Sequence, residues 1–285
     1  MDIADVSGIA ADTALHGIFD THCHYDDHAF DGDRQAVLER IFSHGSPVEY
    51  LMHACTDLVS AEYGITAAEK YPNYYCSVGI HPEVFDKQYG IYRDGLPENA
   101  YKKLKDLAAD PKVKAIGEIG LDYHYEGSDT PEMKAAQNEL FAEQLKLAGE
   151  LDLPVIMHCR DATEDFLAAC RKYRPKGVCH CFSGSAETAQ ELVELGLYIG
   201  FTGTLAFKNS KKTKRAFAAV PTDRVLFETD APYMAPPPFR GCRCESDMIA
   251  YVALEGERLS GIPAQQLIDI TRDNAKRLFD ITSNK

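Results

Sequence analysis

Short apolar segments alternate with longer segments of helical character along most of this chain. The apolar segments are rich in β-branched residues, and such runs are typical of the buried strands of a parallel sheet. Eight of them occur, at residues 17–20, 48–54, 74–80, 113–119, 153–158, 176–181, 196–202 and 223–229. We therefore predict eight strands separated by helices.

The intervening segments carry helix signals. The clearest predicted helix covers residues 131–151 and has Pro131 near its start, where proline is favoured. Another covers 186–196 and ends on a glycine, and the stretch 246–280 is predicted to form two more helices.

Strands that alternate with helices imply parallel βαβ units. Eight such units in 285 residues predict closure into a (β/α)8 TIM barrel, an α/β fold, rather than an open doubly wound sheet. An open sheet of that kind commonly carries a glycine-rich phosphate loop after its first strand, and the segment FDTHCH does not resemble one. We expect one domain over residues 1–285, with 1–15 as a short N-terminal extension.

The composition of the chain bears on its substrate and on the cell compartment in which it works. Hydrophobic residues make up 45% of the chain, and 30 basic against 44 acidic residues give a formal net charge of −14. Because an acidic protein gains little from general attraction to a polyanion, this balance argues mildly against a nuclease. Nine cysteines without a secreted-scaffold pattern indicate reduced thiols. The absence of a signal-peptide pattern and of a long apolar run leads us to expect a cytoplasmic protein with neither a membrane association nor an obligate protein partner.

Ionisable residues recur where the predicted strands end, which is where TIM barrels carry their catalytic groups. The first strand ends in a His-x-His pair whose side chains share one face. Two more histidines, a glutamate and an aspartate complete a set suited to divalent transition metals. The predicted metal ligands are His22, His24, Glu118, His158, His180 and Asp230.

Six ligands are too many for one catalytic ion that keeps an open position, so two ions are predicted. We assign Asp230 to the first ion together with His22 and His24, and we assign His158 and His180 to the second. Glu118 then bridges the two ions. Ions about 3.5–4 Å apart activate a water and neutralise charge on the substrate. The metal identity stays open between zinc, manganese, magnesium and nickel.

Strand alternation also sorts the neighbours of these ligands. Asp20 and Glu228 are predicted to face inward, one layer below the ligands, where they could accept hydrogen bonds from metal-bound imidazoles. Four cysteines beside ligands should face outward as packing residues, namely Cys23, Cys159, Cys179 and Cys181. Cys242 and Cys244 lie in a loop, where a metal or redox role is the less favoured alternative to packing.

The segments FDTHCH, SVGIHPE, AIGEIGLDY, HCFSG and LFETDAPY resemble the TatD family of metal-dependent hydrolases, in its order and approximate spacing. The resemblance runs from about Gly17 to Phe279. It implies a barrel of the amidohydrolase kind, a divalent metal pair held by the same six residues and, commonly, deoxyribonuclease activity. It also places His81 where the family has a histidine on the substrate side. Many relatives have Arg-Gly-x-Arg-Asn-x-Pro after the eighth strand, whereas residues 240–246 here read RGCRCES, so we expect a different rim.

The leading hypothesis is hydrolysis of DNA phosphodiesters, on single strands or ends. Glu118 and Asp230 are the predicted catalytic residues, with Asp230 accepting a proton from the attacking water. His81, Arg160 and Arg243 are the candidates for holding phosphate oxygens. Three aromatic residues could stack on bases, namely Tyr123, Tyr233 and Phe239. The alternative is a small-molecule hydrolase that uses the same metals on a lactone, amide or phosphate ester, which the net charge favours slightly.

Overall fold

The computed structural model describes residues 13–83 and 97–281. Residues 1–12 of the predicted N-terminal extension lie outside the described residues. Eight strands form one sheet in chain order from β1 to β8, and every adjacent pair is parallel. The strands are β1 (Ile18–Cys23), β2 (Val48–His53), β3 (Tyr74–Val78), β4 (Val113–Asp122), β5 (Val155–Arg160), β6 (Gly177–Cys179), β7 (Tyr198–Phe201) and β8 (Val225–Phe227).

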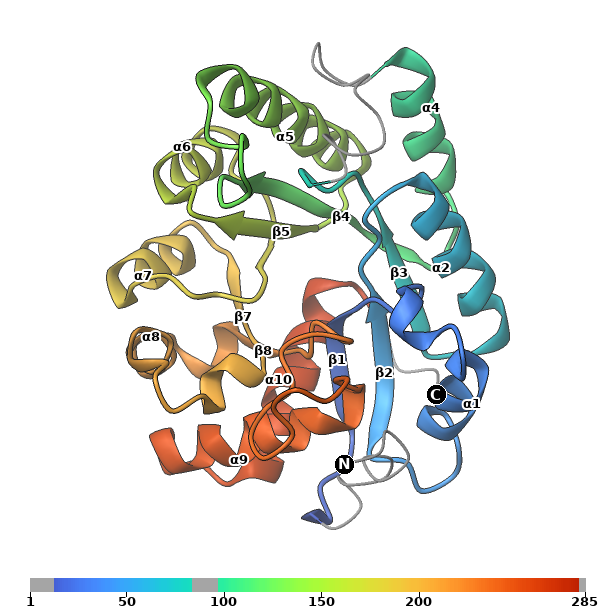
Figure 1. Ribbon diagram of the computed structural model, residues 1–285, viewed down its shortest axis with the longest axis vertical. Coiled ribbons are helices and arrows are strands. Elements are labelled where there is room, and N and C mark those ends of the chain that lie inside the picture. Colours follow the sequence, from blue (N-terminus) through green and yellow to red (C-terminus); the bar gives the residue numbers. More distant parts are fainter. Residues whose placement is uncertain (1–12, 84–96, 282–285) are drawn as a thin grey trace.

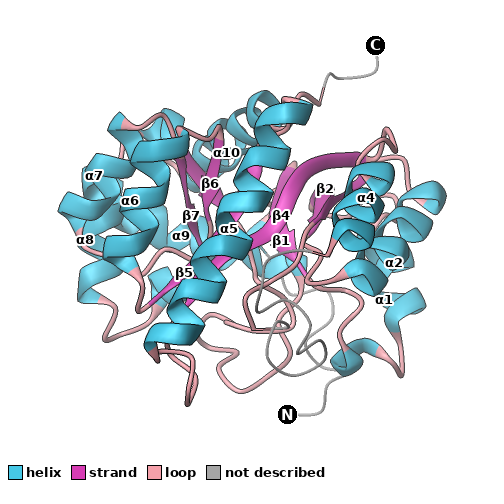
Figure 2. Cartoon of the chain, turned by 90° about the horizontal axis from the view of Figure 1, so that it is seen from above, coloured by secondary structure: helices cyan, strands magenta, loops and turns pink. Residues whose placement is uncertain are grey.

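Helices surround these strands, as Figure 1 shows along one direction and Figure 2 along a perpendicular one. The α-helices are α1 (Arg34–Ile41), α2 (Leu58–Lys70), α4 (Glu98–Leu107), α5 (Pro131–Leu151), α6 (Thr163–Tyr173), α7 (Ala186–Glu194), α8 (Lys211–Ala219), α9 (Ile249–Ser260) and α10 (Ala264–Leu278). A short 3-10 helix, η6 (Ser246–Met248), precedes α9. None of the described helices combines the length and apolar character needed to cross a membrane.

The barrel closes between β1 and β8 at their carboxyl ends. The backbone N–H of Asp230 donates to the carbonyl of His22 at 2.8 Å, and that of His24 donates to the carbonyl of Ala231 at 2.7 Å. Three of the predicted metal ligands therefore lie at the closure itself. The predicted TIM barrel is confirmed.

The interior of the barrel is a packed core. Seven of the eight strands contribute buried side chains to one inner cluster, which consists of Phe19, Tyr50, Met52, Ala115, Ile156, Val178, Tyr198 and Leu226. Leu278 and Phe279, at the end of α10, join this cluster, and Asn274 of the same helix donates to the carbonyls of Thr222 and Val225 at the start of β8. Because α10 covers the amino end of the barrel, the carboxyl end is the one left for a site.

Local signals account for most element boundaries, and α5 has the bounds that the sequence predicts. The Thr130 side chain accepts from the N–H of Met133, Pro131 opens the helix, and Asp152 ends it in a left-handed conformation. Most strand ends differ from the prediction by one to three residues, and two of these differences bear on the site. Strand β4 continues to Asp122, and β6 stops at Cys179.

Candidate metal centre

The six predicted ligands come together at the carboxyl end of the barrel, around a cavity of about 700 Å³. Glu118 lies on β4 and His158 on β5, while His24, His180 and Asp230 follow β1, β6 and β8; all five line the cavity. The remaining ligand, His22 on β1, lies beneath them and is fully buried.

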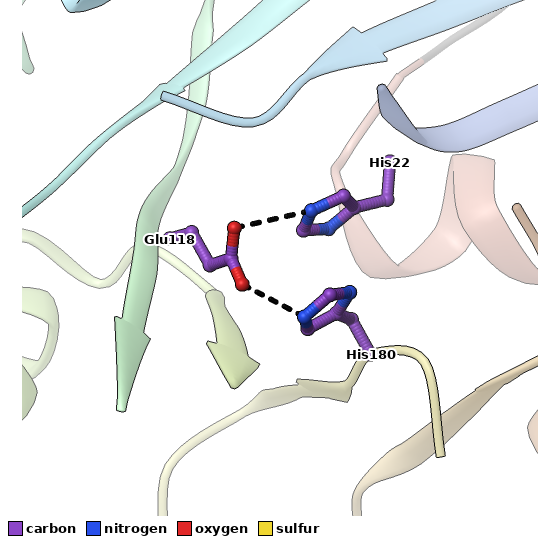
Figure 3. Close-up of side chains that lie close together, drawn as sticks. All are labelled: His22, Glu118 and His180. Atoms are coloured by element: carbon purple, nitrogen blue, oxygen red, sulfur yellow. Dashed lines mark ion pairs between the residues drawn. The ribbon is translucent and has the colours of Figure 1, made fainter. Parts of the chain in front are cut away.

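Glu118 occupies the centre of this group, and its two oxygens face different partners. Oε2 lies 3.2 Å from Nε2 of His22 and 3.7 Å from Nε2 of His24. Oε1 lies 2.7 Å from Nε2 of His180 and 3.2 Å from Nδ1 of His158. Figure 3 shows one carboxylate oxygen facing His22 and the other facing His180, whose rings stack on each other with centroids 3.8 Å apart. One carboxylate thus contacts two adjoining sets of imidazoles through different oxygens.

Glycines let the strand that carries Glu118 pass close to its neighbours. A Cβ atom at Gly79 would come within 2.7 Å of the carbonyl carbon of Gly117. Gly120 has a φ of 146°, and a Cβ atom there would lie 2.0 Å from the carbonyl oxygen of His158. Only glycine fits such approaches, which bring Glu118 and His158 from adjacent strands into contact.

The first set has the spacing of ligands to a single ion. Nε2 of His22 lies 3.1 Å from Nε2 of His24, and Asp230 Oδ1 lies 3.3 Å from the latter nitrogen. Nitrogens bound tetrahedrally to one zinc-like ion at 2.0–2.1 Å are about 3.3 Å apart. Nδ1 of both histidines is buried and has no hydrogen-bond partner among the described residues. Donor type and spacing fit a bound metal.

The second set repeats this arrangement on the other side of Glu118. Nδ1 of His158 lies 3.2 Å from Nε2 of His180, and Nε2 of His81 lies 3.4 Å from Glu118 Oε1. His81, Glu118 and His158 each offer a ligand atom within 4.8 Å of the others. His81, predicted as a substrate contact, therefore lies at ligand distance as well.

Charge within the cluster is strongly coupled. Burial opposes ionisation of Glu118, but the surrounding histidines, His180 foremost, hold its pKa well below the ordinary value. Burial likewise opposes a charge on His24 and His158, yet their hydrogen-bonded carboxylates raise the pKa of each to about 9. The carboxylates at the centre thus stay ionised.

Asp122 supports His158 and was missed by the sequence reasoning. Its Oδ2 lies 2.9 Å from Nε2 of His158. The side chain of Gln137 holds the backbone of Asp122, because its Oε1 accepts from the Asp122 N–H and its Nε2 donates to the Asp122 carbonyl. A carboxylate on one imidazole nitrogen directs the other toward a metal. Strand alternation could have identified Asp122, because residues 118 and 122 share a face of an extended strand. The predicted strand ended at residue 119, so this alternation was not followed to residue 122.

The orientation predicted for Asp20 is wrong. The register of β1 against β2 shifts between Asp20 and Cys23, so alternation is interrupted before the ligand pair. Asp20 points away from the inner cluster and accepts from the hydroxyls of Thr229 and Ser246, both at 2.6 Å, and from the N–H of His22 at 3.2 Å. Burial raises its pKa to about 6 despite these bonds. Asp20 therefore braces the backbone at the closure and contacts no imidazole.

Glu228 lies inside, as predicted, and is fully buried. Its Oε1 accepts from the N–H of Cys181 and lies 3.7 Å from Nδ1 of His180, beyond hydrogen-bond distance. Burial raises its pKa to about 7. Its direct contact is with the loop that carries His180.

One of the four cysteines also departs from the prediction. Cys23 and Cys179 are buried in the outer core, and Cys159 packs against that core although it also lines the cavity, whereas Cys181 lines the cavity without joining the core. Because β6 ends at Cys179, alternation does not extend to Cys181, whose φ is 44°. Burial raises the pKa of the Cys181 thiol well above its usual value, so it stays protonated. Within the described part of the chain, no group of potential metal ligands includes a cysteine.

The two predicted arginines have different surroundings. Arg160 lines the cavity. Arg243 does not, because its guanidinium donates twice to Asp33 and once to Glu245, each at 2.7 Å, and lies over the ring of Phe30. The structure does not support the phosphate contact predicted for Arg243.

Residues 244–246, where the chain departs from the family pattern, also hold the rim in place. Glu245, at the variable position of that pattern, accepts from both Arg243 and Arg40, and Ser246, which replaces the proline, donates to Asp20. These bonds tie the rim to α1 and β1.

Comparison with known proteins agrees with this geometry. The family model of TatD related DNase matches residues 19–280. The chain belongs to the TatD family. The uncharacterised metal-dependent hydrolase YabD of Bacillus subtilis is 38% identical over 267 residues, which cover 93% of this chain and 99% of YabD. The 3'-5' ssDNA/RNA exonuclease TatD of Citrobacter rodentium is 34% identical over 93% of this chain and 98% of its own length.

The crystal structure of YjjV, a TatD homologue from Escherichia coli, superimposes with a TM-score of 0.82. That chain is 31% identical, and the match covers 93% of this chain and 99% of YjjV. The family resemblance of the motifs is confirmed, and with it the assignment as a metal-dependent hydrolase.

Proposed function

We propose that this TatD-family hydrolase cleaves phosphodiester bonds in DNA with a pair of divalent ions. The contact pattern of Glu118 carries the proposal, because one oxygen faces His22 and His24 while the other faces His158 and His180. A bridging carboxylate between two ions has this environment.

The chain's own residues have separate tasks in this mechanism. His22, His24 and Asp230, which lie within ligand distance of one another, would hold one ion. His158 and His180, which lie 3.2 Å apart and both contact Glu118, would hold the other, and Glu118 would contact both. Such a pair supplies an activated water and neutralises charge on the phosphate. The excess of imidazole over carboxylate ligands favours zinc or nickel over manganese or magnesium.

Asp230 is the proposed proton acceptor. It lines the cavity, and although burial opposes its ionisation, His24 and His180 hold its pKa below the ordinary value. It is thus ionised and could take a proton from a water that bound ions would activate. Arg160 lines the same cavity and offers a forked donor to a phosphate oxygen.

DNA is the proposed substrate because relatives similar over nearly their whole length carry the name 3'-5' ssDNA/RNA exonuclease. The free state of all nine cysteines agrees with a reducing compartment, so we retain the expectation of a cytoplasmic protein.

A small-molecule ester is the second candidate, and the charge of the cavity favours it. Asp26, Asp27 and Glu83 line the cavity in addition to the proposed ligands. Among the described lining residues, Arg160 is the only lysine or arginine. Such a cavity offers a long polyanion few contacts beyond the metals.

A metal and substrate panel separates the two candidates. The chelated protein would be reloaded with zinc, manganese, nickel or magnesium and given single-stranded DNA, duplex DNA, RNA, a lactone and a phosphate monoester. We expect two metal equivalents and the highest kcat/KM on single-stranded DNA. Efficient hydrolysis of the small esters with DNA left intact would refute the proposal.

A further inference from the structure

Exposed apolar side chains gather at the mouth of the cavity. Among the described residues, the large hydrophobic side chains that are exposed are Val59, Tyr125, Tyr233, Met234 and Leu254. Tyr125, Tyr233 and Met234, with exposed fractions of 38%, 51% and 39%, all line the cavity. Concentrated exposed apolar surface marks a place where a ligand or partner binds.

Tyr233 is held in place by both of its ends. Its backbone N–H donates to the carbonyl of Asp230 at 2.8 Å, which fixes it close to a proposed metal ligand. Its hydroxyl donates to Oδ2 of Asp27 at 2.7 Å. The ring therefore bridges the loops after β8 and β1 and presents an exposed apolar surface to the cavity.

The backbone at Met234 has an unusual conformation and passes close to Gly203. Met234 has a φ of 57°, which is uncommon for a side-chain-bearing residue. A Cβ atom at Gly203 would come within 2.0 Å of the Met234 carbonyl oxygen, so only glycine at 203 lets this backbone pass. Such local strain, held by its surroundings, is typical of functional sites.

Tyr125 lies on the other side of the cavity, after β4, since β4 and β5 are opposite β8 and β1 in the strand order. The guanidinium of Arg160 lies 5.5 Å from the centre of its ring. A cation thus lies over an exposed aromatic ring on this wall. The other two residues expected to stack do not contribute: the hydroxyl of buried Tyr123 donates to Asp165, and buried Phe239 packs on Tyr251.

We infer that Tyr125, Tyr233 and Met234 form a stacking subsite for one nucleobase next to the phosphate that is cleaved. This inference rests on the proposed phosphodiesterase function and adds the element that selects the substrate. Aromatic side chains stack on any base, and a neutral planar ring suits a mouth that also carries Asp26, Asp27 and Glu83. The subsite therefore recognises a base, while Arg160 and the metals take a single phosphate.

The test compares oligonucleotides that differ only in one base. The metal-loaded protein would be given tetrathymidylate and four versions that each lack one base. For the parent, removal of one particular base should lower kcat/KM about tenfold or more, the order expected for one lost stack. Tyr125→Leu and Tyr233→Leu should lower kcat/KM on the intact tetramer by a similar factor and leave hydrolysis of that abasic version unchanged.

A matched control is Tyr101→Leu, a tyrosine on α4 that does not line the cavity, and it should change neither rate. Equal hydrolysis of intact and abasic tetramers by the parent, or equal losses on both in the variants, would overturn the subsite. If the parent cleaves no phosphodiester, the proposed function fails instead. Binding of a non-hydrolysable phosphorothioate tetramer, intact against abasic, then decides the subsite on its own.

Discussion

The bond between Asp122 and His158 offers a sharp test of how this site holds metal. Asp122→Asn keeps the size of the side chain and removes its charge. The 2.9 Å contact with Nε2 of His158 then changes from a charge-assisted to a neutral hydrogen bond. His158 loses the partner that directs its Nδ1 toward Glu118 and His180, so the variant should weaken the second ion and leave the first in place.

The magnitude follows from the burial of the pair. Asp122 is 1% exposed, so water screens the contact little. Loss of a carboxylate behind a metal-bound histidine typically lowers metal affinity by about tenfold to a hundredfold. This corresponds to about 1.4–2.7 kcal/mol.

The loss of metal affinity in Asp122→Asn should depend on pH, because metal and proton compete for His158. Asp122 and Glu118 raise the pKa of His158 to about 9 against burial, so at neutral pH a metal must displace a proton from the parent protein. With Asn at position 122 this pKa falls and the competition weakens. The difference between variant and parent should therefore be small at pH 6.5 and should approach the full factor at pH 8.5.

Isothermal titration with manganese at these two pH values, in buffers of different ionisation enthalpy, measures both affinity and proton release. Asp161→Asn is the matched control, because this exposed carboxylate bonds to His124 at 2.7 Å and contacts none of the proposed ligands. Equal weakening of both ions, or a loss that grows as the pH falls, would refute the reasoning.

Four further substitutions test other parts of the site. Glu118→Gln should lose at least one ion and nearly all activity, because each oxygen faces a different set of histidines; two bound equivalents with normal turnover would contradict the bridge. Arg160→Ala should lower hydrolysis of oligonucleotides, relative to an uncharged ester, by about tenfold to a hundredfold with metal content unchanged. Arg243→Ala should instead lower the melting temperature, since it removes the partner of Asp33 and one of the two partners of Glu245. A selective loss of activity on DNA would restore its phosphate role. Cys181→Ser should bind as many ions as the parent by elemental analysis, and metal loss would make this cysteine a ligand.

The order of the elements and the place of the site could be predicted from local patterns. Apolar runs separated by helical segments determine parallel strands, and the carboxyl ends of such strands meet at one end of a barrel. Residues at these ends, such as His22 and Asp230, are therefore brought together although 208 positions separate them in the chain. The helix over residues 131–151 likewise follows from signals within its own sequence.

Tertiary structure alone decided where the neighbouring side chains point. Asp20 turned away from the site because β1 shifts register against β2, and Cys181 turned toward it because β6 ended two residues earlier. Arg243 was taken by Asp33, a partner 210 residues away. Alternation and charge are properties of the local sequence, whereas register, strand length and the choice of ionic partner depend on the energies of contacts between distant segments. Such contacts exist only once the barrel has closed.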